Sequence, residues 1–240
     1  MEIKVNALAL KCVDYRDNDK MVTLYSLERG LIGVCVRGVK KAGAKLGFCA
    51  QPFCFAEYVI NESGNRMTVT GATEIESFYK IRLDLHAFYA GACVLEFLLK
   101  FTRDEEPDKR TFVLAVESLK RLNFGEGLPE RVLADFLFKE TEISGYAIGS
   151  GTCACCGKAA SDFEKCYFDS DDGVVVCEDC FSDGMREIMP CTAIALSAVS
   201  EGKDFCDKSA LKYLLKFFNY YYRLKTGEYV YSIDELVSLP

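Results

Sequence analysis

Residues 5–26 read VNALALKCVDYRDNDKMVTLYS, two apolar segments on either side of a polar stretch. Short segments rich in Val, Ile, Thr, Tyr and Phe and separated by turn residues are typical of β-strands. Three more follow before residue 80. The five predicted strands are Val5–Val13, Met21–Ser26, Ile32–Val39, Phe53–Ile60 and Arg66–Thr73. Five short strands in so short a segment predict a small closed barrel of the OB-fold type.

The connections between these strands fall into two kinds. Arg29-Gly30 and Asn61–Asn65 have the composition of hairpin turns. The stretch 37–45 is basic and dotted with glycines, so we expect an exposed loop there.

After Phe78 the apolar period changes from two residues to three or four, which predicts helices. The first predicted apolar face comprises Ile81, Leu85, Phe88, Ala92, Leu95 and Leu99, and the second comprises Phe112, Val116, Leu119 and Leu122. A third helix is expected over Glu130–Thr141. Asp207 is a suitable N-cap for a last helix that runs through Tyr222 and buries Leu211, Leu214, Leu215, Phe218 and Tyr222.

The pattern therefore predicts an α+β chain of two domains. A barrel domain is expected over residues 1–78, and a helical domain over 79–240 with a cysteine-rich insert at about 150–182.

The composition excludes several classes of protein. The 240 residues are 50% hydrophobic and 27% charged, which is close to the average of folded globular chains. No apolar run approaches the ~18 residues of a membrane span, and the start at Met1 lacks the regions of a signal peptide, so we expect a cytoplasmic protein. The single histidine, His86, removes most routes to Ser-His-Asp, Cys-His and His-metal chemistry, which favours a protein that is not an enzyme.

Charge is distributed unevenly along the chain, whose net charge is −7. Residues 1–48 hold nine Lys or Arg against five Asp or Glu, a net charge of +4, and the remaining residues carry −11. A basic segment on an acidic chain predicts an anion-binding site at the N-terminal end.

The insert carries the strongest local motif. Cys153 and Cys156 form one C-x2-C pair, Cys177 and Cys180 form another, and twenty residues separate them. This spacing is typical of a structural zinc site in which two turns present four thiolates to one Zn²⁺ ion. Gly157 suits the tight backbone of such a turn. Four thiolates leave no open coordination position, so we expect the ion to stabilise the fold without activating water.

Two other cysteines leave alternatives open. Cys155 offers a competing C-x-C pair with Cys153, and Cys166 lies inside the loop. Thirteen cysteines in a reducing compartment, an odd number, do not predict a disulfide framework. Two alternatives to the zinc site remain: the thiols of the insert are reduced and hold no metal, or a C-x2-C pair is a redox motif, although the βαβ pattern that usually surrounds such a motif is lacking.

Several motifs follow one another along nearly the whole chain. They are the segment Ala7–Leu24, Arg29-Gly30, Val36–Lys41, Leu46 through Gln51-Pro52-Phe53, the helices after Phe78, the paired C-x2-C motifs and the Leu-x2-Leu-x2-Phe-Phe of the last predicted helix. In this order the motifs resemble the RecO family of bacterial DNA repair proteins.

The resemblance implies an N-terminal OB-fold, a helical C-terminal domain with a zinc knuckle, and a non-enzymatic role as a recombination mediator. RecO proteins bind single- and double-stranded DNA, anneal complementary strands, bind the acidic C-terminal tail of single-stranded-DNA-binding protein, and act with RecR to load RecA. The protein would be cytoplasmic and associated with the nucleoid during repair. The basic positions that match the family motif, and so the expected DNA contacts, are Arg37, Lys40, Lys41 and Lys45, with Lys11 and Lys20 on neighbouring strands.

The acidic tail would bind a pocket in the helical domain that has an apolar floor and a basic rim. Candidates for the rim are Lys100, Arg103, Arg110, Lys120 and Arg121.

Three other interpretations compete with this one. The basic loop can be a solvated surface without a ligand. The protein can be a zinc-stabilised interaction adaptor that does not bind DNA, which would show little dependence on salt. A zinc-dependent enzyme that acts on nucleic acid would need an open metal position and a nearby general base, and the motifs provide neither.

Overall fold

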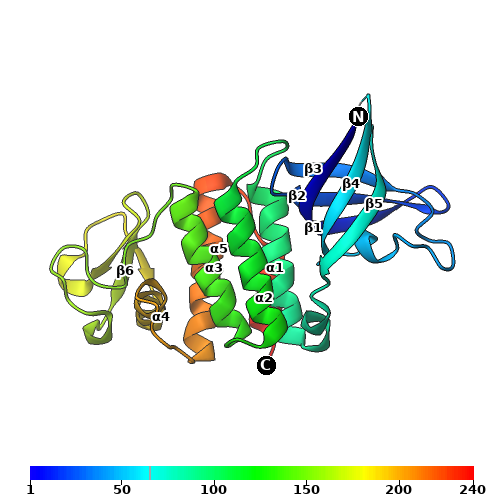
Figure 1. Ribbon diagram of the computed structural model, residues 1–240. Helices are drawn as coiled ribbons and strands as arrows, with labels where there is room; N and C mark the ends of the chain where they lie inside the picture. Colours follow the sequence, from blue (N-terminus) through cyan, green and yellow to red (C-terminus); the bar gives the residue numbers. More distant parts are fainter. Residues whose placement is uncertain (65) are drawn as a thin grey trace. The chain divides into compact units, whose positions relative to one another are not determined.

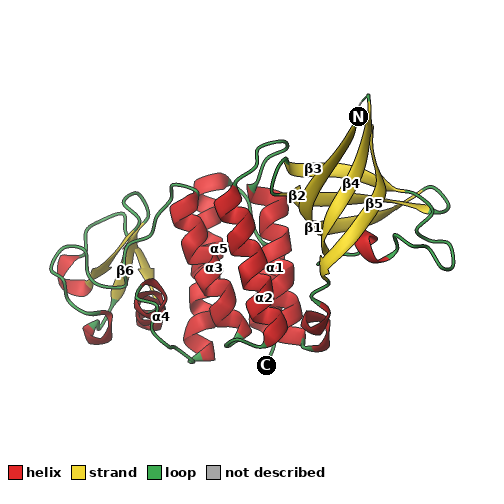
Figure 2. Ribbon diagram, in the orientation of Figure 1, coloured by secondary structure: helices red, strands yellow, loops and turns green. Residues whose placement is uncertain are grey.

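The computed structural model describes residues 1–64 and 66–240, which form two compact units, Met1–Phe124 and Gly125–Pro240 (Figures 1 and 2). Asn65, the last residue of the predicted Asn61–Asn65 connection, lies outside the described residues.

The first unit begins with the predicted barrel. Its strands are β1 (Glu2–Tyr15), β2 (Asp19–Ser26), β3 (Gly30–Val36), β4 (Phe55–Ser63) and β5 (Arg66–Glu76). They close in the order β1-β2-β3-β5-β4, where β3 and β5 pair in parallel and the other neighbours pair antiparallel. This five-stranded closed barrel confirms the predicted OB-type architecture.

Alternation along the strands produces the barrel core. Val22 and Leu24 on β2, and Val34 and Val36 on β3, are buried, and the residues between them are less buried or face solvent. The buried Tyr58 on β4 places its hydroxyl within the core, where it donates to the carbonyl of Cys49 at 3.0 Å. Apart from Tyr58, whose hydroxyl is paired, the described side chains of this core are apolar or cysteine.

Two helices, α1 (Leu85–Phe101) and α2 (Lys109–Phe124), complete the first unit. Phe112 of α2 lies 6.0 Å from the ring of Tyr25 on β2, and the Tyr25 hydroxyl donates to the carbonyl of Asp108. Gly30 comes so close to the segment between α1 and α2 that an added Cβ would lie 2.7 Å from the backbone of Glu106. Strands β2 and β3 of the barrel are therefore in direct contact with α2 and with the segment that precedes it.

The predicted face of α2 is correct, but that of α1 is only partly so. Phe112, Val116, Leu119 and Leu122 are all buried. On α1, Leu85 and Phe88 are 56% and 37% exposed, and the helix buries Ala90, Val94 and Leu98 instead. Because the apolar residues of α1 itself are distributed around the whole helix, their spacing does not predict which face is buried.

The second unit contains four helices and a small sheet. The helices are α3 (Pro129–Ile143), α4 (Pro190–Ser200), α5 (Lys208–Thr226) and α6 (Tyr231–Ser238), and the strands are β6 (Cys166–Asp169), β7 (Val174–Cys177) and β8 (Arg186–Ile188), in the order β7-β6-β8. The sheet, α4 and α6 were not predicted from the sequence. The described helices lack the combination of length and apolar character that crossing a membrane requires.

The N-cap predicted for α5 is confirmed, since the carboxylate of Asp207 accepts a hydrogen bond from the N–H of Ala210 at 3.1 Å. All five residues predicted to be buried on this helix are buried. Two details are wrong: α5 continues beyond Tyr222 to Thr226, and α6 follows it, so α5 is not the last helix.

Candidate functional site

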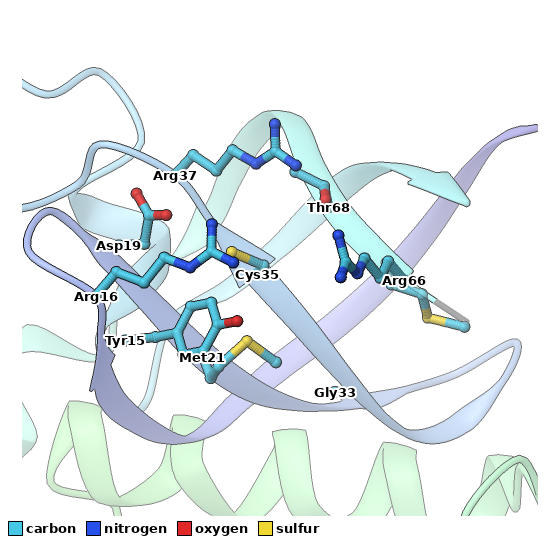
Figure 3. Close-up of a pocket in the computed structure, with 10 residues that line it drawn as sticks. Tyr15, Arg16, Asp19, Met21, Gly33, Cys35, Arg37, Arg66 and Thr68 are labelled. Carbon is cyan, nitrogen blue, oxygen red and sulfur yellow. The ribbon is translucent and has the colours of Figure 1, made fainter. Parts of the chain in front are cut away.

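A groove on the outside of the barrel gathers cations from three separate segments (Figure 3). Arg16 lies in the turn between β1 and β2, Arg37 follows β3, and Arg66 begins β5. Their guanidinium groups are turned toward Cys35 and Thr68, which are partners across the parallel β3–β5 pairing. The whole lining consists of Tyr15, Arg16, Asp19, Met21, Gly33, Cys35, Arg37, Arg66, Met67 and Thr68. The cavity volume is about 160 Å³, which is smaller than a typical small-molecule pocket.

The groove occupies the face by which OB-folds bind oligonucleotides and oligosaccharides. That face is formed by the second and third strands and is flanked by the β1–β2 and β4–β5 turns. Here β2 contributes Met21, and β3 contributes Gly33 and Cys35. Arg16 lies within the β1–β2 turn, and Arg66 lies at the start of β5, directly after the β4–β5 turn. Gly33 has open space where a Cβ would be, so it leaves the floor of the groove flat.

The three arginines are available to an anion. They are exposed, and within the described part of the chain none of them has a carboxylate within 4.0 Å. Arg16 lies over the ring of Tyr15 at 5.0 Å and has φ = 56°. The one acid of the lining, Asp19, is engaged, because its Oδ1 accepts a hydrogen bond from the N–H of Gly38 at 2.8 Å. The net charge of the lining is therefore positive.

The predicted DNA contacts are only partly brought together. Arg37 lines the groove. Lys40, Lys41 and Lys45 are exposed on the loop after β3, and Lys11 is exposed on β1. Lys40 Nζ pairs with Asp14 at 2.8 Å, and Lys20 Nζ is directed to the carbonyl of Ala50 at 3.5 Å. Arg16 and Arg66 were not singled out from the sequence, since each is an isolated cation beside a turn.

An acidic hollow borders the groove. It shares Gly33 and Met67 with the groove and is otherwise lined by Leu31, Ile32 and two acids, Asp104 and Glu105. The two acids would repel a polyanion that approached the groove from this side.

In the second unit the four predicted metal ligands come together. The thiol sulfurs of Cys153, Cys156, Cys177 and Cys180 all lie within 4.8 Å of one another. Those of Cys156 and Cys177 are 3.7 Å apart. A tetrahedral ion with metal–sulfur distances of ~2.3 Å places its sulfurs about 3.8 Å apart, so the donor set and its spacing fit one metal ion.

The backbone forms a turn around this cluster. The N–H of Gly157 donates to the carbonyl of Cys153 at 2.9 Å, and Gly157 has φ = 75°, as a tight turn requires. The N–H of Cys177 donates to Cys153 Sγ at 3.4 Å. Burial alone would raise the pKa of the Cys153 thiol, but hydrogen bonds from neighbouring backbone N–H groups, the first from Cys177, lower it to about 6. The turn thus favours the thiolate, the form that binds metal.

The two competing cysteines lie outside the cluster. Cys155 is exposed, and Cys166 is buried on β6 opposite Cys177. Burial raises the pKa of the Cys166 thiol to about 12, which favours the neutral form. Lys158 pairs with Glu178 and, at 3.4 Å, with Asp179, so a charged network surrounds the turn.

The predicted basic rim is largely neutralised. Lys100 pairs with Glu96 at 2.8 Å, Arg103 with Glu106 at 3.7 Å, and Arg110 with Asp108 at 3.1 Å. The described residues around these cations do not single out one of them as the site for an acidic tail.

Comparison with known proteins places the whole chain in one family. The family description "Recombination protein O N terminal" matches residues 1–78, and "Recombination protein O C terminal" matches residues 82–232. The DNA repair protein RecO of Bacillus pumilus is 32% identical over 182 residues, which cover 76% of this chain and 70% of that protein. The DNA repair protein RecO of Desulforamulus reducens is 29% identical, with coverage of 95% and 93%. Together with the closed barrel and the four-cysteine cluster, these matches show that the chain belongs to the RecO family of DNA repair proteins.

Proposed function

We propose that this protein is a recombination mediator that binds single- and double-stranded DNA, anneals complementary strands and helps RecR to load RecA. The observation that carries the proposal is the groove on the barrel, in which three arginines that pair with no carboxylate among the described residues surround a strand face of the kind that binds oligonucleotides. Membership of a DNA repair family supports the same role. The protein is proposed to act without enzymatic turnover, in the cytoplasm and near the nucleoid.

The groove suits phosphates better than bases as the main contacts. Arginine donates two parallel hydrogen bonds to a phosphate, and contacts of this kind do not depend on sequence. Tyr15 and Met21 offer apolar surface on which a base can stack. We therefore expect binding without strong sequence preference, as annealing of arbitrary strands requires.

The other basic residues extend the path of the strand unequally. Lys41, Lys45 and Lys11 are exposed and are proposed to contact phosphates beyond the groove. Lys40 and Lys20 are held by Asp14 and by the carbonyl of Ala50, so smaller contributions are assigned to them.

Zinc is the ion proposed for the cluster formed by Cys153, Cys156, Cys177 and Cys180. Four thiolates in a tetrahedron are the donor set of structural Zn²⁺, and such an ion supplies folding free energy. The chain's own contribution is the turn at Gly157 and the backbone donors that stabilise the thiolates. The C-terminal tail of single-stranded-DNA-binding protein is a further proposed partner, with no assigned contact residues.

The test is fluorescence anisotropy of a labelled oligothymidine, titrated with the full chain at several salt concentrations. Arg37→Ala with Arg66→Ala should weaken binding and lower the slope of log affinity against log salt by about 1.4, since each phosphate contact contributes ~0.7 on single strands. Lys4→Ala with Lys109→Ala is the control with the same charge change on exposed residues outside the groove. If the wild-type chain binds no DNA, or binds with no dependence on salt, the adaptor interpretation replaces this one.

A further inference from the structure

Helix α5 concentrates positive charge in the acidic part of the chain. Residues Lys208–Gly227 contain five Lys or Arg and no Asp or Glu, although the whole protein has a net charge of −7. A helix used only for packing needs no such bias, because its buried face is apolar and its exposed face can carry either sign.

The exposed face of α5 alternates aromatic and basic side chains. Tyr213 is 44% exposed, Lys216 and Arg223 are exposed, and Tyr220 is half-buried. Tyr213 and Tyr220 are seven residues apart, which places them on one face about 10.5 Å from each other along the helix axis. Lys216 Nζ lies 6.0 Å from the ring centroid of Tyr213, beside its aromatic surface.

A cation from another element joins this face. The guanidinium of Arg186, on β8, lies 3.7 Å from the ring centroid of Tyr220, a stacked arrangement. Stacking fixes the plane of a guanidinium while its N–H groups remain free to donate. Arg186 is itself exposed, so its donors face solvent. We call Arg186, Tyr213, Lys216, Tyr220 and Arg223 the α5 surface.

The cations of the α5 surface contact aromatic rings but are not neutralised by acids among the described residues. Across residues 1–64 and 66–240, none of Arg186, Lys216 and Arg223 has a carboxylate within 4.0 Å. Other cations of the second unit do form such pairs, for example Arg131 with Asp135 and Lys203 with Glu201. The α5 surface therefore offers unneutralised charge together with exposed aromatic rings.

The geometry points to a second binding surface for single-stranded nucleic acid on α5, in which Tyr213 stacks on a base and Arg186, Lys216 and Arg223 contact phosphates. Exposed aromatic rings between cations are the usual platform for unpaired bases, and a duplex does not offer its base faces. The inference rests on the proposed DNA-binding function and goes further. The chain has two surfaces for unpaired strands, one in each compact unit, so one molecule can hold two strands at once.

The experiment measures how many short strands one full-length chain binds. Native mass spectrometry with hexathymidine should give two strands per wild-type chain at saturation. Tyr213→Ser with Lys216→Glu should reduce the number to one. The matched control is Tyr231→Ser with Lys139→Glu, which removes a tyrosine that is more exposed than Tyr213 and makes the same charge change elsewhere in the second unit, and it should leave two.

A second readout locates the contact directly. An oligothymidine that carries 5-iododeoxyuridine should crosslink under ultraviolet light to the peptide that contains Tyr213. Arg37→Ala with Arg66→Ala should leave this crosslink in place, because those residues lie in the other surface. The affinity that remains in the groove variant should fall about tenfold on adding Tyr213→Ser.

The outcomes separate the two claims. Two strands bound by the Tyr213→Ser, Lys216→Glu variant, together with no crosslink at Tyr213 in the wild-type chain, would overturn the α5 surface and leave the barrel groove intact. If the Arg37→Ala, Arg66→Ala variant binds DNA as tightly as the wild-type chain and still crosslinks at Tyr213, the groove is overturned as a binding site and the α5 surface is retained. If an acidic peptide binds to α5 and no DNA strand does, the surface binds protein instead.

Discussion

Lys40 Nζ lies 2.8 Å from Asp14 Oδ2, so one of the four cations of the loop after β3 is paired with the end of β1. The hydrogen bond and the charge of Lys40 lower the pKa of Asp14 below its ordinary value of 3.8. The carboxylate therefore stays charged at neutral pH, and the pair breaks only when the pH falls through the lowered pKa.

Asp14→Asn should strengthen DNA binding, the opposite of what most surface substitutions do, because it releases Lys40 for a phosphate. The expected change in the salt slope is an increase of up to about 0.7 on single strands. Asp17→Asn is the control, since it removes the same charge from an exposed acid without a described partner in the same turn. Anisotropy titrations should show a larger gain for Asp14→Asn; equal gains would mean that only net charge matters.

Gly33→Val should block the groove without disturbing the barrel. Gly33 is exposed on β3, a Cβ there would meet nothing within 4 Å, and valine is favoured in strands. The added methyl groups would fill the flat floor between the arginines. We expect weaker DNA binding at unchanged thermal stability, measured by anisotropy and by circular dichroism on the same preparation. Unchanged affinity would place the strand away from the floor of the groove.

The purified protein should carry about one zinc per chain by elemental analysis. Cys177→Ser should remove the metal, and Cys166→Ser should not, because the Cys166 thiol lies outside the four-sulfur cluster. Metal loss should expose the turn to trypsin at Lys158 and Lys165 while the barrel stays resistant, since metal binding and folding of such an insert are coupled. Zinc retained by Cys177→Ser would reassign the ligands.

Gly30→Ala should destabilise the first unit by about 2 kcal/mol or more. Gly30 has φ = 65°, and a Cβ there would lie 2.7 Å from the backbone of Glu106, which cannot move freely. Gly43→Ala isolates the backbone cost, because Gly43 has φ = 73° but open space around the new Cβ. Urea denaturation should show a clearly greater loss for Gly30→Ala; equal losses would mean that the contact with Glu106 relaxes at little cost.

Asn219→Leu should destabilise the second unit by about 3 kcal/mol. The buried Asn219 donates to the carbonyl of Val230 at 2.9 Å and accepts from its N–H at 2.9 Å, so it holds the start of α6 against α5. Leucine fits the volume but leaves the N–H of Val230 without its partner and removes one of the two hydrogen bonds to the Val230 carbonyl, which keeps the N–H of Ile233 at 3.3 Å. Tyr229→Phe removes a hydroxyl bonded to Asp234 at the surface and should cost less than about 0.5 kcal/mol. Denaturation midpoints of both variants test the difference.

The parts of the fold that could be predicted are those in which near neighbours in sequence decide the structure. Alternation within β2 and β3 is enough to predict strands, and the C-x2-C spacing is enough to predict which four cysteines meet. Asp207 could be identified as a cap because a cap bonds to the N–H three residues later.

The groove could not be predicted because it depends on pairings between distant segments. Arg37 and Arg66 become neighbours only through the parallel register in which Cys35 faces Thr68, and strand periodicity does not specify a partner. Asp14 likewise reaches Lys40 across 26 residues, so the loop looked free of acids in the sequence. The short helix α4 was missed because its small apolar residues give little periodicity.

The stacking of Arg186 on Tyr220 links the α5 surface to the four-cysteine cluster through the sheet that carries both Arg186 and Cys177. Strand β6 lies between β7, which ends at Cys177, and β8, which begins at Arg186. Phe168 of β6 packs against Phe217 of α5 with ring centroids 4.7 Å apart. If the proposed ion holds this sheet in place, loss of the metal should weaken strand binding on α5, and thermodynamic linkage then requires that a bound strand strengthen metal binding by the same factor.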